Sequence, residues 1–154
     1  MGRSLAVEAR EALAEARCRL AAPQLELVER ARVSANDATG ERDRLLCAVV
    51  NAYRIGDRQV WSAVLLDLLA PAMLRRLAAF RVQSNSIDAA DLRQQLVVEV
   101  LAAAASMPLP SGARFVERRL VLRAGQGVRR WLQRERRWST TTVGLDTITQ
   151  EASK

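Results

Sequence analysis

The sequence contains no histidine, and lysine occurs only once, as Lys154, among 24 basic residues. The lack of histidine excludes catalytic triads, general bases and metal sites that depend on an imidazole. Glycine-rich phosphate loops and acidic clusters with metal-ligand spacing are also missing from the sequence. We therefore expect neither an enzyme nor a metal-binding protein, with no catalytic residue and no cofactor.

Cysteines, aromatic residues and long apolar runs are scarce as well. Cys18 and Cys47 have no metal-ligand spacing, so we expect buried thiols in a reducing compartment. Aromatic residues make up 4% of a chain that is 49% hydrophobic through its many alanines and leucines, which favours helices. Glu99 interrupts the longest apolar run, and early charges such as Arg3 and Glu8 exclude a signal peptide. The sequence therefore predicts a cytoplasmic protein that does not enter a membrane.

What the chain does have is a basic segment, residues 114–137, which carries the entire net charge of +7. The segment contains nine arginines and two acidic residues, whereas the rest of the chain has 15 basic and 15 acidic residues. On a helical projection its apolar residues gather on one side and most of its arginines on the other. Gly125 and Gly127 lie within it, and we expect a bend there because each costs about 1 kcal/mol relative to alanine.

The arginine side of this segment has more than one reading. A charged face is often only a solvated surface, but charge of one sign repels itself when it has no partner. Arginine also suits phosphate well, because its planar guanidinium donates two parallel hydrogen bonds. We expect nucleic acid to be contacted by Arg118, Arg119, Arg123, Arg129, Arg130, Arg134, Arg136, Arg137 and Trp138.

Apolar residues at intervals of three and four predict helices along most of the chain, and no segment alternates with a period of two. The expected helices cover about residues 5–22, 24–34, 41–55, 58–80, 89–106 and 114–137. Asp57 and Asp88 are placed to cap two of them, and Pro71 should bend a third. Residues 81–87 are expected to form a turn.

The fold class is therefore all-α. We expect a helical extension over residues 1–36, a helical bundle over residues 41–137 and a disordered polar tail over residues 138–154. The role of the extension stays open: its helices dimerise, cover another surface or simply pack on the bundle.

Four sequence features within residues 61–137 occur in a recognisable order. They are a helix with a central proline (LLDLLAPAMLRRLAAF, 65–80), the run DAADLRQQLVVEVLAAA (88–104), Phe115 after a linker rich in proline and glycine, and the ending WLQRERR. In this order they resemble region 2 of bacterial sigma factors, and most closely the small extracytoplasmic-function group.

The resemblance implies a three-helix region with two tasks. Asp91, Gln94 and Gln95 would dock on the coiled-coil clamp of core RNA polymerase, and the basic helix would hold the non-template strand of the minus-ten promoter element. Positions where the family carries tryptophan, asparagine and aspartate hold arginine, glycine and glutamine here. Only 17 residues follow Arg137, too few for the family's helix-turn-helix domain. The resemblance thus implies either a separate protein that supplies this domain or a degenerate sigma factor that competes.

The sequence predicts a sigma-like transcription regulator that binds core RNA polymerase, DNA or both. Two alternatives remain open. One is a helical protein–protein adaptor whose arginines meet an acidic partner. The other is an unrelated small DNA-binding protein that uses the same arginine-rich helix.

Overall fold

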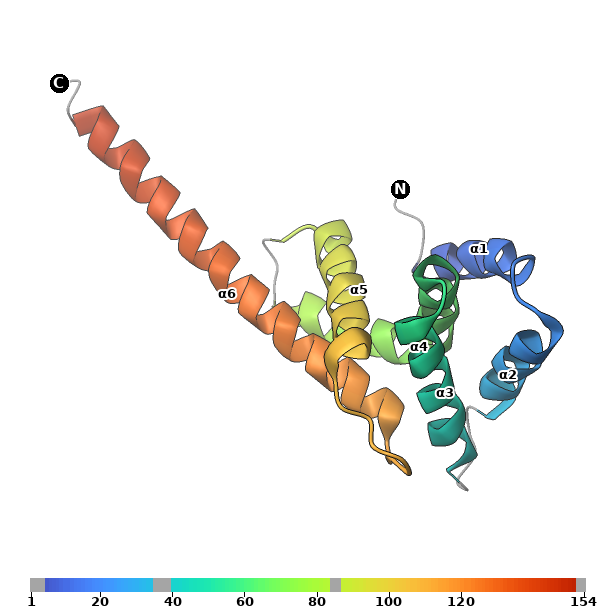
Figure 1. Cartoon of the computed structure of the whole chain (residues 1–154). Helices are drawn as coiled ribbons and strands as arrows, with labels where there is room; N and C mark the ends of the chain where they lie inside the picture. The colour runs from blue at the N-terminus through green and yellow to red at the C-terminus, as the bar shows by residue number, and fades with distance from the viewer. Residues whose placement is uncertain (1–4, 35–39, 84–86, 152–154) are drawn as a thin grey trace.

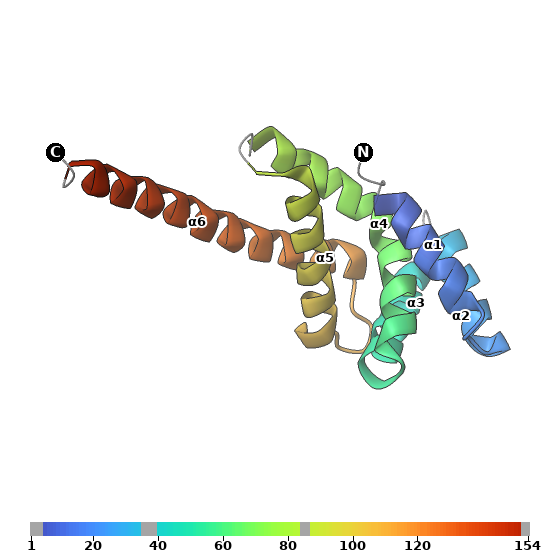
Figure 2. The ribbon, with the colours of Figure 1, turned by 90° about the horizontal axis from the view of Figure 1, so that it is seen from above.

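The computed structural model describes residues 5–34, 40–83 and 87–151. In this part of the chain there are six α-helices and no strand, which confirms the all-α prediction. The helices are α1 (Leu5–Arg17), α2 (Ala22–Val33), α3 (Glu41–Ile55), α4 (Arg58–Gln83), α5 (Ala89–Ser106) and α6 (Val116–Glu151). Figures 1 and 2 show the first five gathered in a bundle, from which the C-terminal part of α6 projects.

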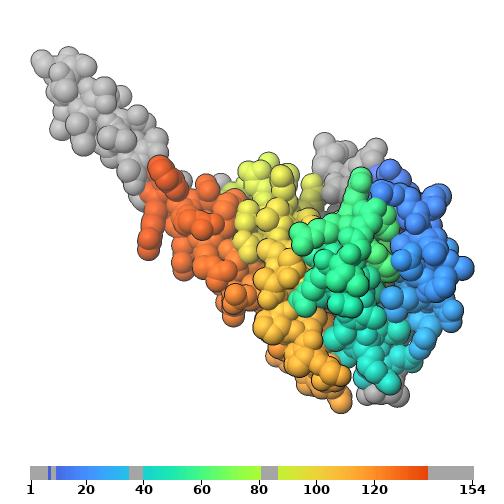
Figure 3. All heavy atoms as spheres, in the orientation of Figure 1, coloured from blue at the N-terminus to red at the C-terminus, as the bar shows by residue number. Residues whose placement is uncertain are grey.

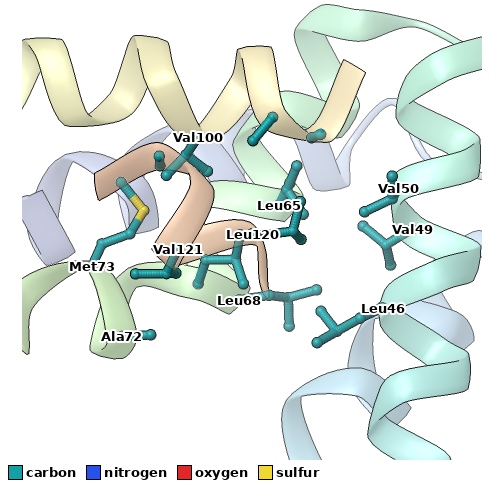
Figure 4. Packing of buried hydrophobic residues seen from close by; sticks show 14 of the residues in the cluster. Leu46, Val49, Val50, Leu65, Leu68, Ala72, Met73, Val100, Leu120 and Val121 are labelled. Carbon is teal, nitrogen blue, oxygen red and sulfur yellow. The ribbon is translucent and has the colours of Figure 1, made fainter. Parts of the chain in front are cut away.

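The core of the bundle forms around α4, which packs against α1, α3, α5 and α6. Figure 4 shows where α3, α4, α5 and α6 meet, with Leu46, Leu65, Val100 and Leu120 among the buried side chains. The apolar residues spaced at intervals of three and four on α3 (Leu45, Leu46, Val49, Val50 and Tyr53) and on α5 (Leu92, Leu96, Val100 and Ala104) are all buried. The periodicity therefore predicted the orientation of these two helices correctly.

The N-terminal extension consists of α1 and α2, which pack on α4 and α3. α1 ends at Arg17, five residues before the predicted boundary, because the backbone turns there: the Leu20 amide donates to the Arg17 carbonyl at 3.3 Å. Pro23 lies in the first turn of α2, where a residue without an N–H is well tolerated. The proline thus begins a helix, and the extension forms an extra layer on the bundle.

Two aspartates cap helices as predicted. Asp57 accepts hydrogen bonds from the amides of Gln59 and Val60 at the start of α4. Asp88 accepts one from the Ala90 amide at the start of α5. These contacts satisfy amides that have no partner within their own helix.

α4 differs from its predicted form at its end. It continues through residues 81–83, which were predicted as part of a turn, because no proline or glycine interrupts it there. Residues 84–86 of the same predicted turn lie outside the described residues. α4 changes direction along its length in Figure 2, as predicted for a helix that contains Pro71, whose missing N–H leaves the Asp67 carbonyl without its helical donor.

α6 continues to Glu151, although residues 138–154 were predicted to be a disordered tail. Extending an existing helix avoids the cost of nucleation, and residues 138–151 contain no proline that would stop it. The 36 residues of α6 give it a length of roughly 54 Å. Its second half therefore reaches well beyond the bundle (Figure 1).

The prediction of buried thiols is wrong for Cys18, which is exposed, while Cys47 is half-buried. Cys18 is exposed because α1 ends at Arg17, so the residue falls in the turn that follows. Both cysteines are free thiols.

Candidate nucleic-acid interface

The basic helix α6 begins at a cap supplied by another helix. The Asp43 carboxylate on α3 accepts hydrogen bonds from the amides of Phe115, at 3.0 Å, and Val116, at 2.9 Å. Phe115 has φ of 56°, in the left-handed region that aromatic residues rarely adopt. Such a conformation persists where surrounding contacts enforce it. Asp43 therefore fixes both the position and the direction in which α6 starts.

Arg42, next to Asp43, ties the same end of α6 to two further helices. Its guanidinium donates to the Ala31 carbonyl at 2.8 Å, the Leu68 carbonyl at 3.1 Å and the Glu117 carboxylate at 2.8 Å. One side chain of α3 thus joins α2, α4 and the first turn of α6. The basic helix is anchored by polar contacts before its apolar side enters the core.

The apolar side of α6 is buried as the projection predicted. Its fully or nearly fully buried residues are Val116, Leu120, Val121, Ala124, Val128 and Leu132. Trp131 is half-buried and packs on the same core. This packing ends at Leu132, so the orientation of the helix is set over its first 17 residues, from Val116 to Leu132.

The two glycines of α6 permit a close approach between helices. A Cβ atom at Gly127 would overlap the Glu99 carboxylate on α5, and one at Gly125 would lie 2.7 Å from Arg76 Nε on α4. Figure 1 shows α6 without a kink along its length, so the bend predicted at these glycines is not seen. Their role is therefore to make room for charged side chains of α4 and α5.

The opposite side of α6, which we call the arginine face, is exposed. It carries Arg118, Arg119, Arg123, Arg129, Arg130, Arg134, Arg136 and Arg137. Within the described residues, Arg118, Arg123, Arg129, Arg130 and Arg134 have no hydrogen-bond or ion-pair partner. Arg119 donates to the Pro108 carbonyl at 3.5 Å. Figure 3 shows the later coloured turns of α6 at the end of the molecule away from α1 and α2, and the exposure of the arginines shows that the extension does not cover them.

Seven of the eight arginines form two rows along this face, and Arg134 lies farther round the helix, about 100° from Gln133. At about 100° per residue within the helix, Leu122, Gln126 and Gln133 fall on one central line. On one side of that line lie Arg118, Arg129 and Arg136; on the other lie Arg119, Arg123, Arg130 and Arg137. All these residues are exposed, and each row lies about 50° from the central line. The face is therefore positive at both edges and neutral in the middle.

Residues at the two ends of the face differ from its centre. Arg114 lies 3.8 Å from the Asp43 carboxylate and 5.9 Å from the centre of the Phe115 ring, so it belongs to the cap. Phe115 is 66% exposed and Trp138 is 70% exposed. Both aromatic side chains are therefore accessible, Phe115 just before α6 and Trp138 beyond its last buried residue.

The residues predicted to bind polymerase lie on α5. Asp91 and Gln94 are exposed on its outer side, near Val98, which is 53% exposed. Gln95 is half-buried and donates to the Glu99 carboxylate at 3.0 Å. The structure thus places Asp91 and Gln94 together at the surface and turns Gln95 partly toward α6. Because these two residues are exposed, the N-terminal extension does not cover them.

Sequence reasoning missed a cavity of about 360 Å³ between α3 and the linker that precedes α6. Its lining includes Arg44, Cys47, Asn51 and Arg54 together with residues 109–113. Arg54 is held there by the carbonyls of Ala104, at 2.8 Å, and Met107, at 2.5 Å. The cavity depends on how the linker folds back on α3, and no residue pattern in the sequence indicates that contact.

Burial raises the pKa of the Cys47 thiol above its usual value, and the charge of Asp43 raises it further. Arg119 and Arg54 act in the opposite direction, but burial dominates. Cys47 is therefore kept as a neutral thiol, which is a poor nucleophile.

Wider comparisons give the site no family name. The chain matches no protein-family model, no curated protein and no solved structure. Within the described residues, no group of three or more acidic, cysteine or histidine side chains is placed to hold a metal ion. Among the described helices, none combines the length and apolar character needed to cross a bilayer. Function must therefore be argued from the surfaces of α5 and α6.

Proposed function

We propose that the protein is a sigma-like transcription regulator that binds DNA through the arginine face of α6 and core RNA polymerase through α5. The observation that carries the proposal is the division of α6 into a side buried in the core and a side with exposed arginines. Arginines that bind phosphates release condensed counterions from DNA, which is a large favourable contribution to binding.

The polymerase part of the proposal rests on α5. Asp91 and Gln94 are neighbours on an exposed helical surface, and both match the family pattern that the sequence resembles. α5 packs directly on α6, so the two proposed surfaces belong to adjacent helices. A protein built in this way would hold DNA at a fixed position relative to polymerase.

DNA binding is tested by a salt titration with a fluorescent duplex, in which log affinity is plotted against log salt concentration. Each phosphate contact contributes a slope of about −0.9 on duplex DNA, so Arg129→Gln with Arg130→Gln should reduce the slope by about two contacts. Arg44→Gln with Arg75→Gln is the matched control, because it removes the same charge from exposed positions on α3 and α4. Equal slopes for the two double variants would contradict the proposal, and absence of DNA binding at low salt would favour the adaptor with an acidic partner.

Polymerase binding is tested by a pull-down with purified core enzyme. Asp91→Ala combined with Gln94→Ala should reduce retention at least tenfold relative to wild type. Glu26→Ala on α2 serves as the control, because it removes one surface charge far from α5 in sequence. If wild type is not retained, or if the double variant is retained equally well, the polymerase part of the proposal is wrong.

A further inference from the structure

We infer that α6 binds duplex DNA by lying in the major groove, with one arginine row on each strand and Leu122, Gln126 and Gln133 facing the bases. The inference rests on the proposed DNA binding and adds the form of the ligand and the residues that read it. It comes from the arrangement of the two arginine rows on either side of a neutral line. A helix that bound DNA by charge alone would not need its arginines in two separate rows.

The two rows fit a ligand with two phosphate backbones. The major groove of B-form DNA is about 12 Å wide, and a helix with its side chains is about 10–12 Å across. A helix in this groove has one backbone on each side, and the rows of the arginine face lie about 50° to each side of its centre. A single strand offers only one backbone, so one of the two rows would remain unpartnered. The groove of duplex RNA is too narrow for a helix.

The central line carries side chains that suit base edges. Glutamine donates to and accepts from adenine in a bidentate pair, and an apolar side chain contacts the thymine methyl group. Gln126 and Gln133 are seven residues apart, or roughly 10 Å along the helix, which corresponds to about three base-pair steps. Both are exposed, and Leu122 is 42% exposed on the same line. The structure therefore assigns sequence reading to these three residues.

The arginine face also lacks features that would oppose this mode. Between Arg118 and Arg134 the helix contains no acidic residue. Glu117 lies just before them, and its carboxylate accepts from Arg42. The buried side of α6 and the cap at Asp43 hold the face rigid, as a reading surface requires.

An anionic membrane surface is a poorer match for this helix. A helix that lies in a membrane interface needs a free apolar side, and the apolar side of α6 is already buried in the core. Apart from Phe115 and Leu122, the described part of the arginine face is polar or charged.

The first test compares wild-type binding to a 20-base-pair random duplex with binding to either single strand, at equal salt. We expect the duplex to bind at least ten times more tightly. Equal or tighter binding of the single strand would overturn the groove inference and leave the proposed DNA binding intact. Failure to bind any nucleic acid would overturn both, and binding only to vesicles of anionic lipid would do the same.

The second test asks whether each row contacts its own strand. Hydroxyl-radical footprints of one bound duplex are recorded for Arg118→Gln with Arg129→Gln, from one row, and for Arg123→Gln with Arg130→Gln, from the other. We expect each variant to lose protection mainly on one strand, and the two variants to affect different strands. Loss from the same strand, or equal loss from both strands, would contradict the arrangement of the rows.

The third test concerns reading of the bases. Selection from a random duplex pool should enrich a motif with adenine–thymine pairs about three steps apart when wild type is used. Gln126→Ala with Gln133→Ala should keep the affinity for random duplex within about twofold and lose that motif. No enrichment with wild type, or the same motif with the variant, would show that these glutamines do not read sequence. Far-UV circular dichroism on all variants establishes that they are folded.

Discussion

The Arg42 guanidinium lies 2.8 Å from the Glu117 carboxylate and joins α3 to the first turn of the basic helix. The Arg42 side chain is 13% exposed and that of Glu117 is 29% exposed, so the pair is partly shielded from water. Arg42 also donates to two carbonyl groups, on α2 and α4. The position of the arginine face therefore depends on Arg42 as well as on its neighbour Asp43, both of which lie outside the face.

Replacing Arg42 should destabilise the fold markedly. We expect Arg42→Met to lower the free energy of unfolding by about 2–3 kcal/mol, because the shielded Glu117 carboxylate loses its partner and the Ala31 and Leu68 carbonyls each lose one of their donors. Glu117→Gln keeps an acceptor for the guanidinium and should cost only about 1 kcal/mol. Urea unfolding measures both values. Arg44→Met, at an exposed position on the same helix, is the control and should stay within about 0.5 kcal/mol of wild type.

Phe115→Gly should be more stable than Phe115→Ala. Alanine retains the Cβ atom that makes the left-handed conformation unfavourable, whereas glycine adopts it freely. We expect a difference of about 1 kcal/mol in the free energy of unfolding, measured by urea titration of the two variants. Both variants lose the same exposed ring, so the comparison isolates the backbone. Equal stability would mean that the left-handed conformation is not enforced in solution.

Gly127→Ala should disturb the contact between α5 and α6. The added methyl group overlaps the Glu99 side chain, which must move, so we expect a loss of about 1–3 kcal/mol. Truncation of the same side chain by Glu99→Ala should remove the overlap, so the double variant should recover most of the loss caused by Gly127→Ala. A double-mutant cycle from thermal or urea unfolding measures this coupling. Additive effects of the two substitutions would contradict the close approach.

The two cysteines should differ in their reactivity toward a disulfide reagent. Cys18 is exposed, whereas Cys47 is half-buried with a raised pKa, so Cys18 should react first near neutral pH. Single-cysteine variants, Cys18→Ser and Cys47→Ser, assign the two rates. Faster reaction of Cys47 would contradict the burial seen in the structure.

The raised pKa of Cys47 also gives stability a dependence on pH. The folded state holds the thiol proton more tightly than the unfolded state does. The contribution is therefore fully present below the ordinary thiol pKa and is lost as pH rises through the raised value. Between pH of about 8 and about 10, wild type should lose more stability than Cys47→Ala, measured by urea unfolding. A smaller loss of stability for wild type than for Cys47→Ala would mean that the pKa of Cys47 is lowered in the folded state, not raised.

The sequence predicted α3 and α5 well because each combines a regular apolar stripe with clear end signals, such as Gly56 after α3 and Asp88 before α5. The ends of α1, α4 and α6 were predicted less well, because no strong breaker marks them. At the ends of α4 and α6 polar residues favoured a turn or a tail, whereas continuing a formed helix costs little. α1 instead ends before its predicted boundary. Boundaries of this kind depend on tertiary contacts more than on local composition.

The candidate site likewise has a part that the sequence predicted and a part that it did not. The arginine face was predictable, because burial of one side of an amphipathic helix determines which side stays exposed. Its anchoring was not, because Asp43 and Val116 are 73 residues apart and Arg42 and Glu117 are 75 apart. Gly127 illustrates the same limit: its sequence context suggested a bend, whereas its neighbour Glu99 on another helix explains it. Such pairs become visible only when the chain is folded.

Because the core and the arginine face share one helix, the helical phase of one determines that of the other. Inserting a single residue after Gly127 would rotate every later residue by about 100° relative to the core. The helix would have to distort in order to keep Val128 and Leu132 buried. If it stayed regular, arginines would turn toward α5. Inserting four residues would nearly restore the phase. Whether an insertion or deletion in this part of α6 is tolerated should therefore depend more on how it rotates the later residues than on how many residues it adds or removes.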